Sequence, residues 1–176
     1  MFAFLLLPTY TVLFAGEEWL STNFSVRAVI SPSYYRGFVV WAFLTMGYFY
    51  ILLIRLALRV PCTPLRRGVF LLTLAACVSL CYGVFIPYLP RDIPRWAALH
   101  VALAAGSCVL LLAAILLLLL YWREWGMLRV WLVMNGAYGI LFLWGGMVTS
   151  ALEVVFVLSA ELLLREMWVR KNKHDL

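Results

Sequence analysis

Long apolar runs joined by short polar connections are the feature that most constrains this chain. Five runs of roughly 20 residues follow a shorter apolar N-terminal stretch, and a helix of that length crosses a hydrocarbon layer about 30 Å thick. With 66% hydrophobic and only 12% charged residues, the chain is far more apolar than a soluble domain. The sequence therefore predicts an all-α fold, a polytopic membrane bundle of six transmembrane helices forming a single membrane domain over residues 1–176. The predicted spans are about 1–20, 37–58, 68–88, 96–122, 128–147 and 149–167.

The first of these spans has two interpretations. Residues 1–15 are apolar but short, and Pro8 interrupts them. A cleaved signal peptide is one interpretation, although the stretch has no basic n-region and no clear small-residue cleavage site. The other is a spanning helix whose interfacial end continues toward Trp19 and Leu20, and we favour it because membrane helices tolerate proline where neighbours satisfy the freed carbonyl.

The basic residues predict the orientation of the bundle. The chain carries 14 Lys and Arg residues and a formal net charge of +6, and these residues gather at segment ends rather than in an aromatic-interleaved patch. Such clustering indicates topology and argues against a nucleic-acid partner. Six crossings with both termini in the cytosol place ten basic residues inside: Arg55, Arg59, Arg66, Arg67, Arg123, Arg129, Arg165, Arg170, Lys171 and Lys173. The remaining four lie outside: Arg27, Arg36, Arg91 and Arg95. As the membrane in which the protein resides, we favour the plasma (bacterial inner) membrane over a eukaryotic endomembrane.

Two carboxylates lie inside the final apolar run, GGMVTSALEVVFVLSAELLLREMWVR. A charged side chain at the bilayer centre costs about 2.5 kcal/mol or more on insertion scales, so Glu153 and Glu161 should face protein or water. Counting 1.5 Å per helical residue predicts two polar layers. His100 and Glu153 would form an outer layer. Tyr48, Asn135 and Glu161 would form an inner layer near mid-membrane.

These five residues are the candidate ligand-binding or proton-carrying groups, and each also has a purely structural interpretation as a hydrogen-bonded packing contact. The sequence identifies no catalytic residue and no metal or cofactor site. Paired-histidine haem ligation fails because the second histidine, His174, lies in the predicted cytosolic tail. The four cysteines, Cys62, Cys77, Cys81 and Cys108, have no framework spacing and are expected to behave as small apolar residues.

The loop after the first span is long for so small a protein. Residues 17–36 read EEWLSTNFSVRAVISPSYYR, polar and rich in aromatic side chains. Loops of this length in compact domains are more often functional than incidental. Within it, residues 26–30 are expected to form either a short interfacial helix or an extended segment.

Three segments together resemble the six-helix superfamily that includes the damage-regulated autophagy modulators (DRAM) and related bacterial membrane proteins. They are a Gly-led second helix after the long outer loop (SPSYYRGFVVW), a proline-rich outer loop leading into a histidine at the head of the fourth helix (GVFIPYLPRDIPRWAALH), and an acidic residue after a small one in the last helix (LSAELLL). The resemblance covers the topology of nearly the whole chain but rests on a handful of residues. It implies a multi-pass protein, in many members without enzymatic activity, linked to membrane trafficking or lipid handling, and it emphasises His100 and Glu161.

Three functions are consistent with these features. The first is a non-enzymatic integral membrane protein that recognises a lipid, a small amphiphile or a partner helix through an outward-facing polar cavity. An alternative is a small proton-coupled transporter, as a dimer, in which Glu161 carries the proton. The weakest is a lipid-modifying membrane enzyme using His100 and Glu153. The expected partners are membrane lipids, with a second copy or another membrane protein as further candidates.

Overall fold

A computed structural model describes residues 3–17, 19–145 and 148–173 of the chain. Over these ranges the chain is helical and contains no strand. The helices are α1 (Ala3–Ala15), α2 (Phe24–Ala28), α3 (Pro32–Ala57), α4 (Thr63–Phe85), α5 (Pro94–Tyr121), α6 (Trp125–Gly145) and α7 (Ser150–Lys173). Among the described residues, α3, α4 and α5 are long and apolar enough to cross a membrane. The predicted all-α class is therefore confirmed, together with three helices compatible with a membrane location.

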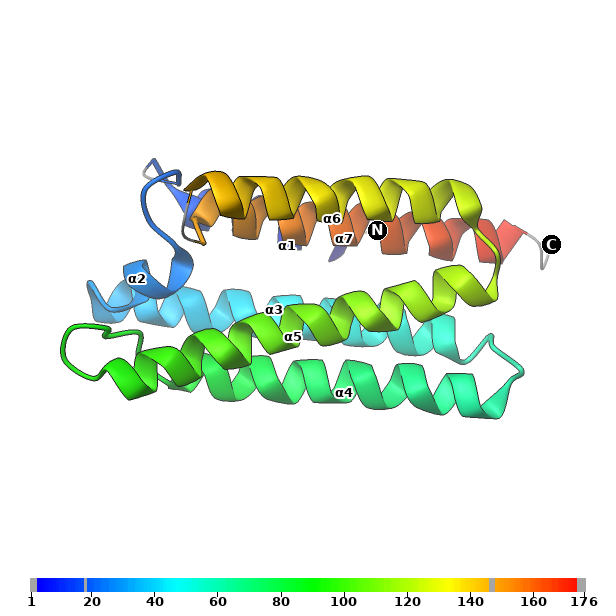
Figure 1. Cartoon of the computed structure of the whole chain (residues 1–176), viewed down its shortest axis with the longest axis horizontal. Helices are drawn as coiled ribbons and strands as arrows, with labels where there is room; N and C mark the ends of the chain where they lie inside the picture. The colour runs from blue at the N-terminus through cyan, green and yellow to red at the C-terminus, as the bar shows by residue number, and fades with distance from the viewer. Residues whose placement is uncertain (1–2, 18, 146–147, 174–176) are drawn as a thin grey trace.

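The long helices lie nearly parallel to one another in a bundle with two distinct ends (Figure 1). α4 packs most extensively along α5, α3 contacts α1, α4 and α7, and α6 lies against α5 and α7. One end, here called the α2 end, holds α2 together with the start of α3, α5 and α7 (Figure 1). The opposite end, here called the basic end, holds the loops joining α3 to α4 and α5 to α6, and the end of α7 (Figure 1).

Helix starts are set by prolines and caps rather than by the edges of the apolar runs. Pro32, Pro64 and Pro94 occupy the first or second position of α3, α4 and α5. Proline suits this position because its missing N–H would have no partner inside the helix. Ser31 caps α3 by accepting a hydrogen bond from the Tyr34 N–H at 3.3 Å. These three helices therefore begin up to five residues before the predicted spans at 37, 68 and 96.

The first helix is shorter than predicted. α1 has 13 residues, so it rises about 20 Å and ends at Ala15 rather than near Leu20. Gly16 follows with φ of 61°, a conformation that favours glycine and breaks the helix. The Arg27 guanidinium lies over this end and donates to the carbonyls of Phe14 and Ala15. Sequence hydropathy could not reveal this stop, since it depends on a side chain 11 positions away from Gly16.

α1 is held against α3 by polar contacts within an aromatic cluster. The Trp41 Nε1–H donates to Thr11 Oγ1 at 3.0 Å, and Thr11 Oγ1 donates to the Leu7 carbonyl at 2.7 Å. The Phe24 ring meets the Trp41 ring edge to face, with centroids 4.7 Å apart. Aromatic pairs in this geometry contribute about 0.5–1.5 kcal/mol beyond the burial of their area. α1, α2 and α3 therefore share one packed cluster at the α2 end.

Apolar side chains fill the bundle towards the basic end and also cover its outside. Fully buried residues of α3, α5 and α7 interlock there: Leu53, Leu56, Ile115, Leu118, Leu164 and Met167. Large apolar side chains are nevertheless exposed on every long helix from α3 to α7, for example Ile51, Leu71, Val109, Val133 and Leu162. Soluble monomers rarely expose contiguous apolar surface on this scale, whereas lipid-facing helices require it.

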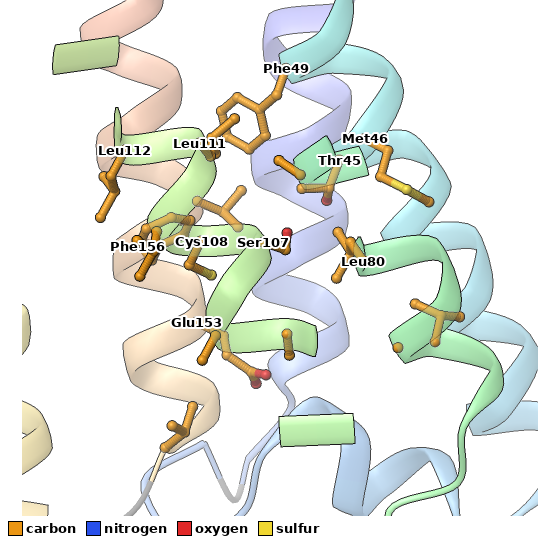
Figure 2. Close-up of a pocket in the computed structure, with 18 of the residues that line it drawn as sticks. Thr45, Met46, Phe49, Leu80, Ser107, Cys108, Leu111, Leu112, Glu153 and Phe156 are labelled. Atoms are coloured by element: carbon orange, nitrogen blue, oxygen red, sulfur yellow. The ribbon is translucent and has the colours of Figure 1, made fainter. Parts of the chain in front are cut away.

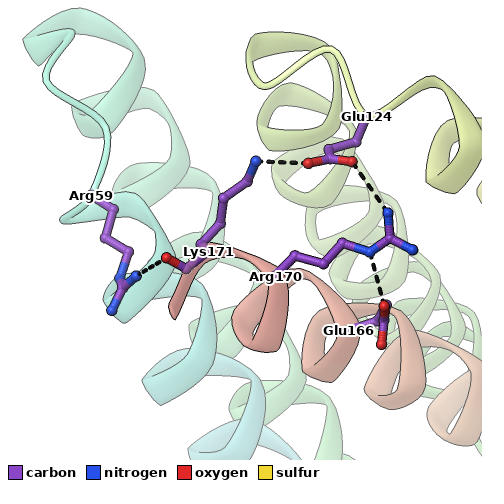
Figure 3. A network of polar contacts seen from close by, with 5 residues as sticks. All are labelled: Arg59, Glu124, Glu166, Arg170 and Lys171. Carbon is purple, nitrogen blue, oxygen red and sulfur yellow. Dashed lines mark hydrogen bonds and ion pairs between the residues drawn. The ribbon is translucent and has the colours of Figure 1, made fainter. Parts of the chain in front are cut away.

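A charged network joins three helix ends at the basic end (Figure 3). Lys171 Nζ contacts Glu124 Oε1 at 2.7 Å, and Arg170 lies 2.8 Å from Glu166 and 3.8 Å from Glu124. Arg59 donates to the Lys171 carbonyl at 2.7 Å, which ties the α3–α4 loop to the end of α7. Arg59 also stacks over the Trp168 ring at 4.6 Å. Ion pairs that water reaches are individually weak, so the network positions α7 more than it stabilises the fold.

The Thr11–Trp41 contact gives a direct test of the α1–α3 packing. Thr11→Val keeps the shape of the side chain but leaves the buried Trp41 N–H without its acceptor. An unpaired buried donor costs about 1–3 kcal/mol, so we expect a lower unfolding temperature in mild detergent. Thr9→Val on the exposed face of α1 is the matched control, expected to change stability by less than about 0.5 kcal/mol. Equal effects of the two variants would show that α1 does not depend on this contact.

Candidate functional site

The short helix α2 is fixed to the rest of the bundle by its own backbone and side chains. Asn23 caps it by accepting the Val26 N–H at 2.7 Å, and Asn23 Nδ2 donates to the Val148 carbonyl at 3.3 Å. The loop before α2 supplies the carbonyls of Thr22 and Trp19 to the N–H groups of Ser150 and Ala151 at 2.6 and 2.8 Å. A helix start has free N–H groups that need acceptors, and this loop provides them for α7. The structure thus selects the helical alternative for the segment around residues 26–30.

Glu153 binds the N-terminus of α2. Its Oε2 accepts a hydrogen bond from the Phe24 N–H at 2.8 Å. Glu153 lies in the first turn of α7, where the helix dipole favours a negative charge. The Glu153 side chain gives the free Phe24 N–H at the start of α2 an acceptor. Glu153 therefore has a structural role in holding α2.

His100 joins α2 to the end of α4. Its Nδ1 lies 2.9 Å from the Gly83 carbonyl and 2.8 Å from the Ile86 carbonyl, and its Nε2 lies 2.7 Å from Ser25 Oγ. Because two carbonyls face Nδ1, that nitrogen carries a proton, and in the neutral ring Nε2 accepts the Ser25 hydroxyl proton. His100 is 5% exposed. It gives the Ile86 carbonyl at the end of α4 a partner, and it is a second partner for the Gly83 carbonyl, which also accepts the Ile86 N–H at 3.1 Å.

The predicted outer layer is therefore brought together through α2. His100 and Glu153 bind the adjacent residues Ser25 and Phe24 rather than each other. Depth matching from the sequence placed the two side chains at one level. It did not reveal that α2 lies between His100 and Glu153.

A cavity of about 370 Å³ extends from this polar end into the bundle. Ser25, His100 and Glu153 line it at the α2 end, and residues of α3, α4, α5, α6 and α7 form its walls. Figure 2 shows Glu153 at one end of the labelled wall and Phe49 and Leu111 towards the other. Natural ligand pockets occupy about 300–1,000 Å³ and combine apolar walls with a few polar groups. The volume of this cavity, its largely apolar walls and its few polar side chains match that description.

Two hydroxyl groups lie in the wall between these ends. Thr45 and Ser107 both line the cavity and are 5% and 7% exposed (Figure 2). Thr45 Oγ1 makes no hydrogen bond to any described residue. A buried hydroxyl without a partner costs about 1–3 kcal/mol, so Thr45 Oγ1 is an unfavourable feature of this part of the wall. Neither residue stood out in the sequence, because a single Thr or Ser in an apolar run is common.

The predicted inner layer is only partly assembled. Glu161 is 3% exposed and interacts with the Tyr48 hydroxyl across the contact between α7 and α3. Asn135 is separate from them: its Nδ2 donates to the Trp131 carbonyl one turn earlier in α6, at 2.7 Å, and its side chain lines the cavity. Tyr48 and Glu161 do not line the cavity. The single inner layer stays a prediction for Asn135, because equal depth does not fix the rotation of a helix.

The described residues contain no cluster of three or more His, Cys, Asp or Glu placed to hold a metal ion. Comparison of the chain with protein-family models, curated proteins and solved structures gave no significant match. The resemblance to the six-helix superfamily stays a prediction from the quoted segments. The candidate site consequently rests on geometry: a largely apolar cavity with Ser25, His100 and Glu153 at its α2 end.

The Phe24–Glu153 contact predicts how firmly α2 is held. Glu153→Ala removes the acceptor of the buried Phe24 N–H, and an unpaired buried donor costs about 1–3 kcal/mol, so local opening should rise about fivefold or more. Amide hydrogen exchange of residues 22–29 measures this opening. Glu161→Ala is the matched control on the same helix, and its exchange in this segment should equal that of the wild type. Unchanged exchange in Glu153→Ala would contradict the assignment of Glu153 as the anchor of α2.

Proposed function

We propose that this protein is a non-enzymatic, multi-pass membrane protein that binds a lipid or small amphiphile in the cavity lined by α3, α4, α5, α6 and α7. The observation that carries the proposal is the cavity of about 370 Å³ with apolar walls and a polar end made by Ser25, His100 and Glu153. An amphiphile matches this arrangement of apolar walls and a polar end, with its chain against the apolar wall and its head group at the α2 end. A partner helix is a poorer match, since an amphipathic helix binds in an open groove along its length.

The wall chemistry supports this occupant. Phe38, Trp41, Met46 and Phe49 of α3 contribute aromatic and thioether groups to the wall, and Leu111 of α5 and Phe156 of α7 also line it. Methionine and aromatic side chains accommodate flexible apolar ligands well. Ser25, His100 and Glu153 gather at the α2 end, as orientation of a single head group requires, and the other polar side chains are spread along the wall.

The same proposal includes a six-span topology, with the basic end and both termini in the cytosol. α6 has 21 residues and exposes Leu132, Val133 and Ile140, as a lipid-facing helix would. α7 has 24 residues, and its buried carboxylates contact α2 and α3 rather than lipid. α1 is the exception in length, and its 13 residues would reach only part of the way across.

Cavity filling tests the binding function. Ala104 lines the cavity, so Ala104→Phe would fill part of it and should reduce bound amphiphile at least tenfold, about 1.4 kcal/mol of binding free energy. Native mass spectrometry of protein purified from membranes measures the bound mass. Ala102→Phe, on the exposed face of the same helix, is the matched control and should retain the ligand.

Two outcomes would count against the function. Wild-type protein without bound amphiphile, before and after addition of membrane lipid extract, would refute the proposal. Equal retention by Ala104→Phe and Ala102→Phe would show that the molecule binds elsewhere. A change in the mass of the bound molecule over prolonged incubation would instead favour the enzymatic alternative.

Cysteine accessibility tests the topology. Cys62 is exposed in the α3–α4 loop at the basic end, and Asp92 is exposed in the α4–α5 loop at the α2 end. A membrane-impermeant thiol reagent applied outside intact cells should leave Cys62 unmodified. The same reagent should modify Asp92→Cys in a Cys62→Ser background. The reverse pattern would invert the orientation, and labelling of both sites would contradict a membrane barrier between the two ends.

A further inference from the structure

We propose that the cavity selects a single-chain amphiphile whose head group donates hydrogen bonds and carries no negative charge, such as a primary amine or an alcohol. This inference rests on the proposed binding function and names the class of ligand. It follows from the polar atoms that Ser25, His100 and Glu153 direct to the head-group end.

The head-group end carries no fixed positive charge. Among the described residues that line the cavity, none is Arg or Lys. Arg27 lies close by in α2, but its guanidinium donates to the carbonyls of Phe14 and Ala15 and stacks over the Tyr34 ring at 5.1 Å. Carboxylate and phosphate groups are normally held by Arg or Lys in charge-assisted hydrogen bonds. The head-group end therefore offers a carboxylate or a phosphate no Arg or Lys partner.

The atoms that do face the head-group end are mainly acceptors. His100 Nδ1 is committed to the Gly83 and Ile86 carbonyls, and Nε2 takes the Ser25 proton, which leaves the lone pairs of Ser25 Oγ free to accept. Phe24 donates to Oε2 of Glu153, so Oε1 has room for a second donor. A head group with N–H or O–H donors satisfies both acceptors.

Charge favours the same ligands. A primary ammonium placed beside Glu153 would form an ion pair within a largely apolar cavity, where the attraction is screened less than in water. A carboxylate at that position would share the site with a second carboxyl group, and two adjacent carboxylates disfavour simultaneous ionisation. The deeper Thr45 hydroxyl, which lacks a partner among the described residues, adds a polar point to the wall but no positive charge.

Three probes of equal chain length test the selectivity. Tetradecylamine, tetradecanol and tetradecanoate differ only in the head group, and native mass spectrometry of the purified wild-type protein measures the fraction bound of each. We expect the amine to bind at least tenfold more tightly than the carboxylate, a difference of about 1.4 kcal/mol, with the alcohol between them. Equal or tighter binding of tetradecanoate would overturn the selectivity while leaving the binding function intact. Failure of all three probes, with no amphiphile retained from membranes, would reject the binding function itself.

Matched carboxylate variants locate the selectivity. Glu153→Gln keeps an acceptor for the Phe24 N–H but removes the charge, so the preference for amine over alcohol should fall about tenfold. Glu161→Gln, outside the cavity wall, should leave that preference unchanged. Ser25→Ala gives an independent measure, because it removes one acceptor and should weaken amine and alcohol but not carboxylate. A preference that survives both Glu153→Gln and Ser25→Ala would place the head group elsewhere.

Discussion

The hydrogen bonds made by α2 are the interactions on which the α2 end of the bundle depends. Three nearby residues of this five-residue helix reach three different partners: Phe24 binds Glu153 of α7, Ser25 binds His100 of α5, and Arg27 binds the end of α1. The Phe24 and Arg27 contacts also satisfy helix termini, since free N–H and carbonyl groups at those ends need partners, while the Ser25 contact joins two side chains. A helix too short to be stable by itself therefore organises its neighbours through polar contacts, while its Phe24 ring packs on Trp41.

The cavity follows from how these helices are joined. Towards the basic end, leucine and methionine side chains interlock between α3, α5 and α7. Nearer the α2 end, small residues replace them, among them Ala76, Gly83 and Ala104 in the wall. Helices in a membrane are held by close packing rather than by exclusion of water, so unfilled space near small residues forfeits contacts. A ligand with an apolar chain would restore those contacts, which gives the cavity a physical reason to bind one.

The sequence was most informative about composition and depth, and least about rotation and long-range contacts. The apolar runs predicted the long helices, although each proline began a helix earlier than hydropathy indicated. Depth counting placed His100 level with Glu153, and Tyr48 level with Glu161. It could not show that Asn135 bonds within its own helix, because depth does not fix the rotation of a helix. Ser25, Arg27 and Thr45 were missed because their roles depend on residues distant in sequence, and no local pattern distinguishes them.

Ligand binding at Glu153 and proton transfer at Glu161 would place different demands on the packing of the helices. Glu153 lines the cavity, so a head group could reach it while every contact of α2 is kept. Glu161 lies between α7 and α3 with the Tyr48 hydroxyl and is 3% exposed. To exchange a proton with both sides of a membrane, it would need α3 and α7 to separate, and the fully buried Leu53 and Leu164 pack those helices into the common core. Ligand binding at Glu153 needs no such rearrangement, so the observed packing favours a binding protein over a carrier built on Glu161.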